Sequence, residues 1–138
     1  MNYFIASPRK LFLTDALGAV LTVALTVGVL APWSQWFGMP AVALYKLAMA
    51  GSVFALYSFD CLLFVRRNFS PFLRIIALAN LGYCVATVAL CVVYRTQVTT
   101  LGLAYFIGEC VVIITLAGVE MKVAAAVNKA EGDRLAHG

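Results

Sequence analysis

The chain has 138 residues, of which 64% are hydrophobic and 12% are charged. A typical soluble chain is about 45–50% apolar and about 25% charged. A water-soluble domain of this length cannot hide so much apolar surface, because much of its area faces water. The composition therefore excludes a water-soluble globule and a disordered chain, and it predicts a membrane protein.

Four apolar stretches are long enough to cross a bilayer, which takes about 20 residues of helix. They cover residues 11–30, 41–65, 72–94 and 100–121. Short connections separate them, so neighbouring helices must run antiparallel. We expect an all-α, polytopic membrane protein in which residues 1–138 form a single integral-membrane domain, a four-transmembrane-helix antiparallel bundle. The polar segment 128–138 is expected to be a flexible tail.

Lysine and arginine are distributed unequally between the two ends of this predicted bundle. Only Lys46 and Arg95 belong to the end opposite the termini. The other eight lie at the end of the termini, and they are Arg9, Lys10, Arg66, Arg67, Arg74, Lys122, Lys129 and Arg134. Because cytoplasmic flanks carry the excess of basic residues, we expect both termini in the cytoplasm of a bacterial inner (plasma) membrane. The net charge of +4 then reflects topology, and we expect no nucleic-acid partner because no extramembrane segment is long enough to form a basic face.

Each predicted helix carries one stripe of polar residues at helical spacing. The stripes include Asp15, Thr22 and Thr26 on the first helix, Lys46 and Asp60 on the second, Asn80, Cys84 and Thr87 on the third, and Tyr105, Glu109 and Glu120 on the fourth. A charge near the bilayer centre costs about 2.5–3.5 kcal/mol, so each charged member needs a partner or a role. Four such stripes predict a bundle with a partly polar interior.

Three of these acids, Asp15, Asp60 and Glu120, lie one or two turns inside the cytoplasmic boundary. We interpret them as a cytoplasmic acidic collar. Either they pair with neighbouring lysines and arginines and fix the helix register, or they form an acidic mouth or ion-coupling site. The sequence leaves both interpretations open.

Lys46 and Glu109 approach from the opposite side and lie deeper, by about 9 and 14 Å at 1.5 Å per residue. They either form an intramembrane ion pair, or Lys46 extends toward the surface and Glu109 stays protonated. We expect a substrate- or ion-binding site that contains Glu109, Lys46, Asn80 and Tyr105.

The two halves of the chain resemble each other weakly. At an offset of 65, residues 22–25 match residues 87–90, and Asp15 aligns with Asn80. Both halves begin on the same side of the membrane. The pattern therefore favours two parallel-repeated helical hairpins related by an axis along the membrane normal.

Cysteine and histidine placement excludes most enzyme mechanisms. Cys61, Cys84, Cys91 and Cys110 form no C-x-x-C pair, and the only histidine is His137. Thiol-redox, zinc-ribbon, paired-histidine haem and Ser-His chemistry therefore lack their parts. We expect no catalytic residue, metal ligand or cofactor; an intramembrane lipid-modifying activity is the one enzymatic alternative left open.

In size and number of spans the chain is similar to the small multidrug-resistance transporters, which are short four-helix proteins that work as dimers. Its Leu13–Gly18 segment does not reproduce their first-helix motif, so none of their sites carries over. Through Leu56-Tyr57-Ser58-Phe59 and Leu78-Ala79-Asn80-Leu81 the chain resembles short four-span bacterial membrane proteins to which no activity is assigned.

The sequence thus predicts a small transporter or permeation protein for a small or cationic solute, with a polar bundle interior around Glu109. The alternative is a non-catalytic accessory or assembly subunit that binds partner helices or lipid. Small residues four apart, as at Ala104 and Gly108, allow close helix packing and leave a homodimer or a partner membrane protein open.

Overall fold

The computed structural model describes residues 7–138, and within them it contains helices and no strand. The elements are α2 (Pro8–Leu25), η1 (Thr26–Leu30), α3 (Ser34–Phe37), α4 (Ala41–Phe64), α5 (Phe69–Val93) and α6 (Thr100–His137). Four of the helical segments are long and apolar enough to cross a membrane, with η1 continuing α2 as a π-helical turn. The predicted all-α bundle with four spans is confirmed.

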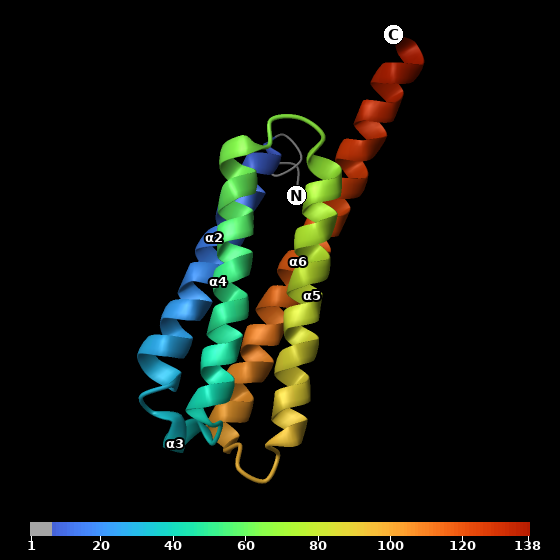
Figure 1. Ribbon diagram of the computed structural model, residues 1–138. Coiled ribbons are helices and arrows are strands. Elements are labelled where there is room, and N and C mark those ends of the chain that lie inside the picture. Colours follow the sequence, from blue (N-terminus) through green and yellow to red (C-terminus); the bar gives the residue numbers. More distant parts are fainter. Residues whose placement is uncertain (1–6) are drawn as a thin grey trace.

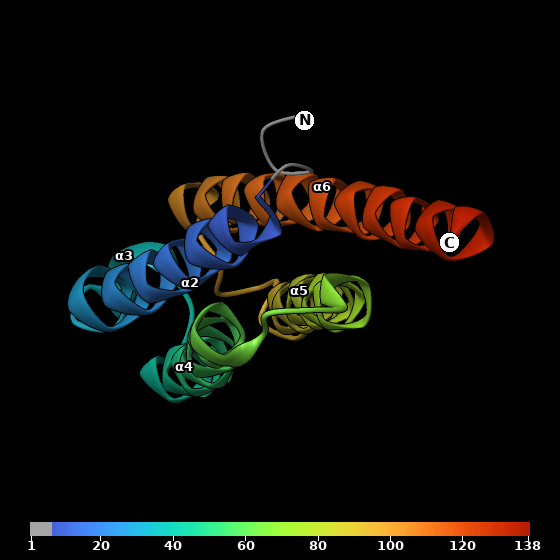
Figure 2. The same ribbon diagram turned by 90° about the horizontal axis from the view of Figure 1, so that it is seen from above.

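The bundle consists of two antiparallel hairpins. α2 packs mainly against α4 and α5 mainly against α6, whereas the contacts between the hairpins are fewer. Figures 1 and 2 show α2 and α4 on one side and α5 and α6 on the other. The amino-terminal end of α2, the α4–α5 connection and the carboxyl-terminal end of α6 lie at one end of the bundle (Figure 1). For brevity we call it the terminal end and its opposite the distal end.

Two apolar clusters fill the interior and leave a polar layer between them. The cluster at the terminal end includes Leu11, Phe12, Leu73 and Val123. The cluster at the distal end includes Leu30, Met39, Leu44, Leu47, Tyr83 and Phe106. Large apolar side chains, among them Leu17, Leu56 and Leu78, are more than half exposed around the outside. Such a surface suits lipid, because water-soluble monomers rarely expose large continuous apolar patches.

At the distal end, the segment around α3 is bonded to the α5–α6 connection. Thr99 caps α6 by accepting a hydrogen bond from the Gly102 amide at 3.1 Å, and its hydroxyl donates to the Trp36 carbonyl at 2.6 Å. A Cβ atom at Gly102 would lie 2.1 Å from the Phe37 carbonyl oxygen. Gly38 has a φ of 75°, which favours glycine. These contacts connect the two hairpins outside the core.

The carboxyl-terminal segment differs from the sequence prediction. Residues 128–138 were expected to form a flexible tail, but α6 remains helical through His137. Alanine, lysine, glutamate and arginine in this stretch have high helix propensity, and Arg134 and His137 lie in the last turn, where cations complement the helix dipole. With 38 residues α6 is about 57 Å long and projects well beyond the other helices (Figure 1).

Candidate functional site

A hydrogen-bonded polar cluster lies between the two hairpins, beside the apolar cluster of the terminal end. The Asn80 side-chain amide donates from Nδ2 to Asp15 Oδ1 at 2.8 Å and to Glu120 Oε2 at 3.2 Å. Ser58 Oγ donates to Asp15 Oδ2. Each residue comes from a different helix, and their side chains are 9% exposed or less. We call Asp15, Ser58, Asn80 and Glu120 the interhelical cluster.

The two carboxyl groups of this cluster are close neighbours. Because both accept from the same nitrogen atom, Asp15 Oδ1 and Glu120 Oε2 lie no more than about 6 Å apart. Two negative charges at that distance repel by about 3 kcal/mol at an effective dielectric constant of 20. The second oxygen of Glu120, Oε1, is buried and has no hydrogen-bond partner. The cluster therefore has the electrostatics of a site that gains from one added positive charge.

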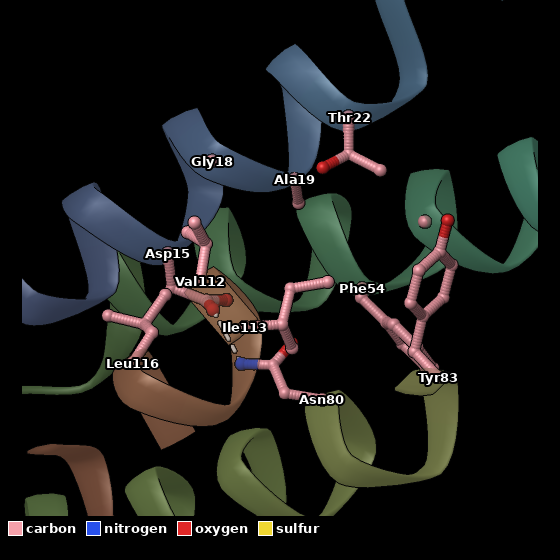
Figure 3. A pocket seen from close by; sticks show the side chains of 11 residues that line it. Asp15, Gly18, Ala19, Thr22, Phe54, Asn80, Tyr83, Val112, Ile113 and Leu116 are labelled. Atoms are coloured by element: carbon pink, nitrogen blue, oxygen red, sulfur yellow. Dashed lines mark hydrogen bonds between the residues drawn. The ribbon is translucent and has the colours of Figure 1, made fainter. Parts of the chain in front are cut away.

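A partly open cavity of about 70 Å³ adjoins the cluster between the helices. It is lined by Asp15, Gly18, Ala19, Thr22, Gly51, Phe54, Asn80, Tyr83, Val112, Ile113 and Leu116. Figure 3 shows Asp15 and Asn80 at one end of it and Tyr83 at the other. Pockets for drug-sized ligands occupy about 300–1,000 Å³, so this cavity suits a few water molecules or one small ion.

A second buried polar group lies nearer the distal end. Both carboxyl oxygens of Glu109 and the hydroxyl of Tyr83 are buried without a hydrogen-bond partner. Glu109 precedes Glu120 by three helical turns, or about 16 Å along α6. Tyr105, half-buried, packs edge-on against Phe37 and Phe106 with ring centroids 6.1 and 5.4 Å away. Glu109 and Glu120 of the interhelical cluster thus lie on one face of α6 but at different depths. Tyr83, which lines the cavity, lies at an intermediate depth.

The contacts among the predicted site residues differ from those that the sequence suggested. Asn80 was predicted to belong with Glu109, but its hydrogen bonds go to Asp15 and Glu120. Of the two alternatives for Lys46 and Glu109, the ion pair is not formed, because Lys46 is exposed on α4 and the Glu109 oxygens have no hydrogen-bond partner; this arrangement fits the alternative in which Lys46 extends toward the surface. The desolvation cost is lower when a lysine at this position extends toward the surface than when it is buried to form an ion pair.

The structure also separates the three residues of the predicted acidic collar. Asp15 and Glu120 meet inside the bundle, whereas Asp60 is exposed and lines a surface groove together with Arg66 and Arg67. The cause is the rotation of α4, which turns Ser58 rather than Asp60 toward Asp15. Ser58 and Asp60 are two residues apart and therefore lie on nearly opposite faces of α4, so the predicted stripe of Lys46 and Asp60 marks the outer face of this helix.

Sequence analysis missed Ser58 and Tyr83. Ser58 follows Leu44 and Gly51 at intervals of seven residues, and all three are buried, so this spacing was the available signal. Tyr83 follows Asn80 by three residues and therefore shares its helix face. Among residues 7–138, no group of three or more histidine, cysteine, aspartate or glutamate side chains is placed to hold a metal ion.

Comparison with known proteins adds no assignment, since no family model, no curated protein and no solved structure matches the chain. The interpretation of the site therefore depends on its geometry. A buried carboxyl group that lines a small cavity, as Asp15 does, can bind a proton or a small cation.

Proposed function

We propose that the protein is a small transporter or permeation protein that moves a small cationic solute between its two hairpins. The observation that carries the proposal is the interhelical cluster, in which two buried acids share one amide beside a partly open cavity. Acids inside a membrane are costly and usually mark an ion or proton pathway. An apolar core would have bound the hairpins together without them.

The size of the cavity limits the solute. About 70 Å³ is too small for a drug-sized molecule, so the multidrug substrates of the transporters that the chain resembles in size do not fit it. The remaining candidate solutes are protons and cations that need only a few coordinating oxygen atoms. Glu109 extends the acidic positions toward the distal end, and Tyr83 adds a hydroxyl group between the two depths.

The test is cation flux into liposomes that contain the purified protein. We expect wild-type protein to dissipate an imposed proton or potassium gradient faster than empty liposomes. Glu109→Gln and Asp15→Asn should lower that rate at least tenfold, whereas Asp60→Asn, an exposed acid, should not. Equal rates for wild-type protein and empty liposomes would refute the proposal, and unaltered flux in Glu109→Gln would remove Glu109 from the pathway.

We also propose that both ends of the chain lie in the cytoplasm of a bacterial inner membrane. The support is the basic excess at the terminal end, where Arg66, Arg67 and Arg74 are exposed. A single cysteine in place of Ser34 in a cysteine-free variant should react with an impermeant thiol reagent added from outside. Reaction of a cysteine at Asn128 from that side would reverse the orientation.

A second candidate, an accessory subunit that binds partner helices, is supported by the outer face of α6. Small residues there are exposed at helical spacing, and they are Ala104, Gly108, Thr115 and Gly118. A Cβ atom at Gly108 or Gly118 would meet no other atom within 4 Å, so this face is free to approach another helix closely. Gly108→Leu should then abolish crosslinking to a partner or second copy, with Gly82→Leu on α5 as the matched control. Unchanged crosslinking in Gly108→Leu would argue against this face.

A further inference from the structure

The interhelical cluster joins the two hairpins through one side chain. Asp15 and Ser58 belong to α2 and α4, whereas Asn80 and Glu120 belong to α5 and α6. Asn80 Nδ2 bridges the two acids, so any change in the charge of one carboxyl group acts directly on the other. The two residues that the 65-residue offset aligns, Asp15 and Asn80, are in contact here.

The carboxyl groups of Asp15 and Glu120 differ in the number of hydrogen bonds that they accept. Each oxygen of Asp15 accepts a hydrogen bond, one from Asn80 and one from Ser58, which is the environment of an ionised carboxylate. Glu120 is fully buried, and only Oε2 accepts a hydrogen bond. Glu120 Oε1 has no hydrogen-bond partner, so a proton added to this atom would leave the other hydrogen bonds of the cluster intact.

A further polar group lines the adjoining cavity at the end opposite Asp15 (Figure 3). Tyr83 lines the adjoining cavity, its side chain is 5% exposed, and its hydroxyl has no hydrogen-bond partner. Figure 3 shows the Asn80 amide nitrogen turned toward Asp15 and its oxygen turned away, among the side chains that line the cavity. A cavity of this size holds a few water molecules, which need such partners.

We propose that Asp15 and Glu120 form a proton-binding site in which one exchangeable proton is held between two carboxyl groups bridged by Asn80. This inference rests on the proposed function and names its substrate. In the binding step, a hydronium ion that reaches the cluster transfers one proton to Glu120, so that an O–H bond forms on this carboxyl group and a water molecule is released. Hard metal cations take six to eight oxygen ligands, more than this cluster offers with its hydrogen bonds intact.

The titratable groups around the site are few among the described residues. Cys61 of α4 faces Asp15, and on α6 the nearest lysine, Lys122, is exposed. Arg74 of α5 and Lys10 of α2 are exposed too, and Asp60 lines the outer groove. The hydrogen-bond donors that contact the two carboxyl groups are Asn80 and Ser58.

The test is infrared spectroscopy of the full chain in lipid nanodiscs, followed as a function of pH. A protonated buried carboxyl group gives a C=O stretching band, and we expect wild-type protein to show a component of this band that is absent in Glu120→Gln and unchanged in Glu109→Gln and Glu131→Gln. Ser58→Ala removes a donor to the Asp15 carboxylate, so the pH midpoint of the band should rise by about one unit. Since Ser58→Ala is a small change, it keeps the test valid even where Glu120→Gln fails to fold.

Three results would overturn the site. They are an absent band in wild-type protein, a band that persists in Glu120→Gln, and a band that sodium removes at constant pH, which would indicate a metal cation instead. Flux measured on the same preparations separates this inference from the proposed function. A Glu120-dependent band without flux refutes transport but not the proton site, whereas Glu109-dependent flux without the band refutes only the proton site.

Discussion

Replacing Asn80 with leucine should destabilise the bundle strongly. The substitution removes the two hydrogen bonds that the amide donates to Asp15 and Glu120, at 2.8 and 3.2 Å. Hydrogen bonds to charged groups contribute about 1.5–3 kcal/mol each, and a buried leucine regains about 2 kcal/mol by apolar contact. We therefore expect a net loss of about 3 kcal/mol, because two buried carboxyl groups then face each other without their shared donor.

The assay is reversible unfolding in mixed detergent and lipid micelles, monitored by circular dichroism. Asn128→Leu, on the exposed part of α6, is the matched control and should change stability by less than about 0.5 kcal/mol. A variant in which Asp15, Ser58, Asn80 and Glu120 are all replaced by apolar residues should recover much of the stability, since no buried polar group is left unpaired. An Asn80→Leu variant within 1 kcal/mol of wild type would refute the reasoning.

Three further substitutions test other parts of the structure by the same unfolding assay. Gly102→Ala should lower the free energy of unfolding by at least about 2 kcal/mol, because the added Cβ would lie 2.1 Å from the Phe37 carbonyl oxygen. Gly82→Ala is the control: its Cβ would meet no atom within 4 Å, so the change should be neutral or stabilising. Equal effects of the two alanines would contradict the close approach of α3 and α6. Thr99→Val removes the cap of α6 and the hydrogen bond to α3, with an expected loss of about 1–2 kcal/mol; no loss would mean that the cap is dispensable. Glu109→Leu should raise stability by about 1 kcal/mol, because it removes a buried carboxyl group whose oxygens have no hydrogen-bond partner, and a decrease would reveal a partner of that group.

The membrane setting and the helix boundaries follow largely from the sequence. The apolar runs match the length that a bilayer requires, and the predicted 41–65 span differs by one residue from α4, Ala41–Phe64. The end of α6 was missed because the polarity of residues 128–138 suggested a solvated coil, although their helix propensity is high. Polarity measures contact with water, and it does not measure the tendency to form a helix.

The site was predictable only in part. Asp15, Asn80 and Glu120 were found because charge and amide groups inside an apolar span have to be explained. Asp15 and Glu120 were placed in one layer, but Asn80 was grouped with Glu109 instead of with these two acids. Periodicity separates Ser58 from Asp60, but it does not decide which face of α4 points inward, and the charged face of Lys46 and Asp60 was assigned to the interior in place of the face that carries Ser58.

The sequence by itself determined that this chain crosses a membrane four times and that its few intramembrane polar residues form one stripe per helix. Both facts depend on free energies of transfer from water to lipid, which are properties of local segments. Only the tertiary structure decided which stripes meet. The rotation and depth of each helix result from side-chain packing across the hairpin interface, and that packing joined Asp15, Asn80 and Glu120, left Glu109 without a partner and turned Lys46 and Asp60 outward.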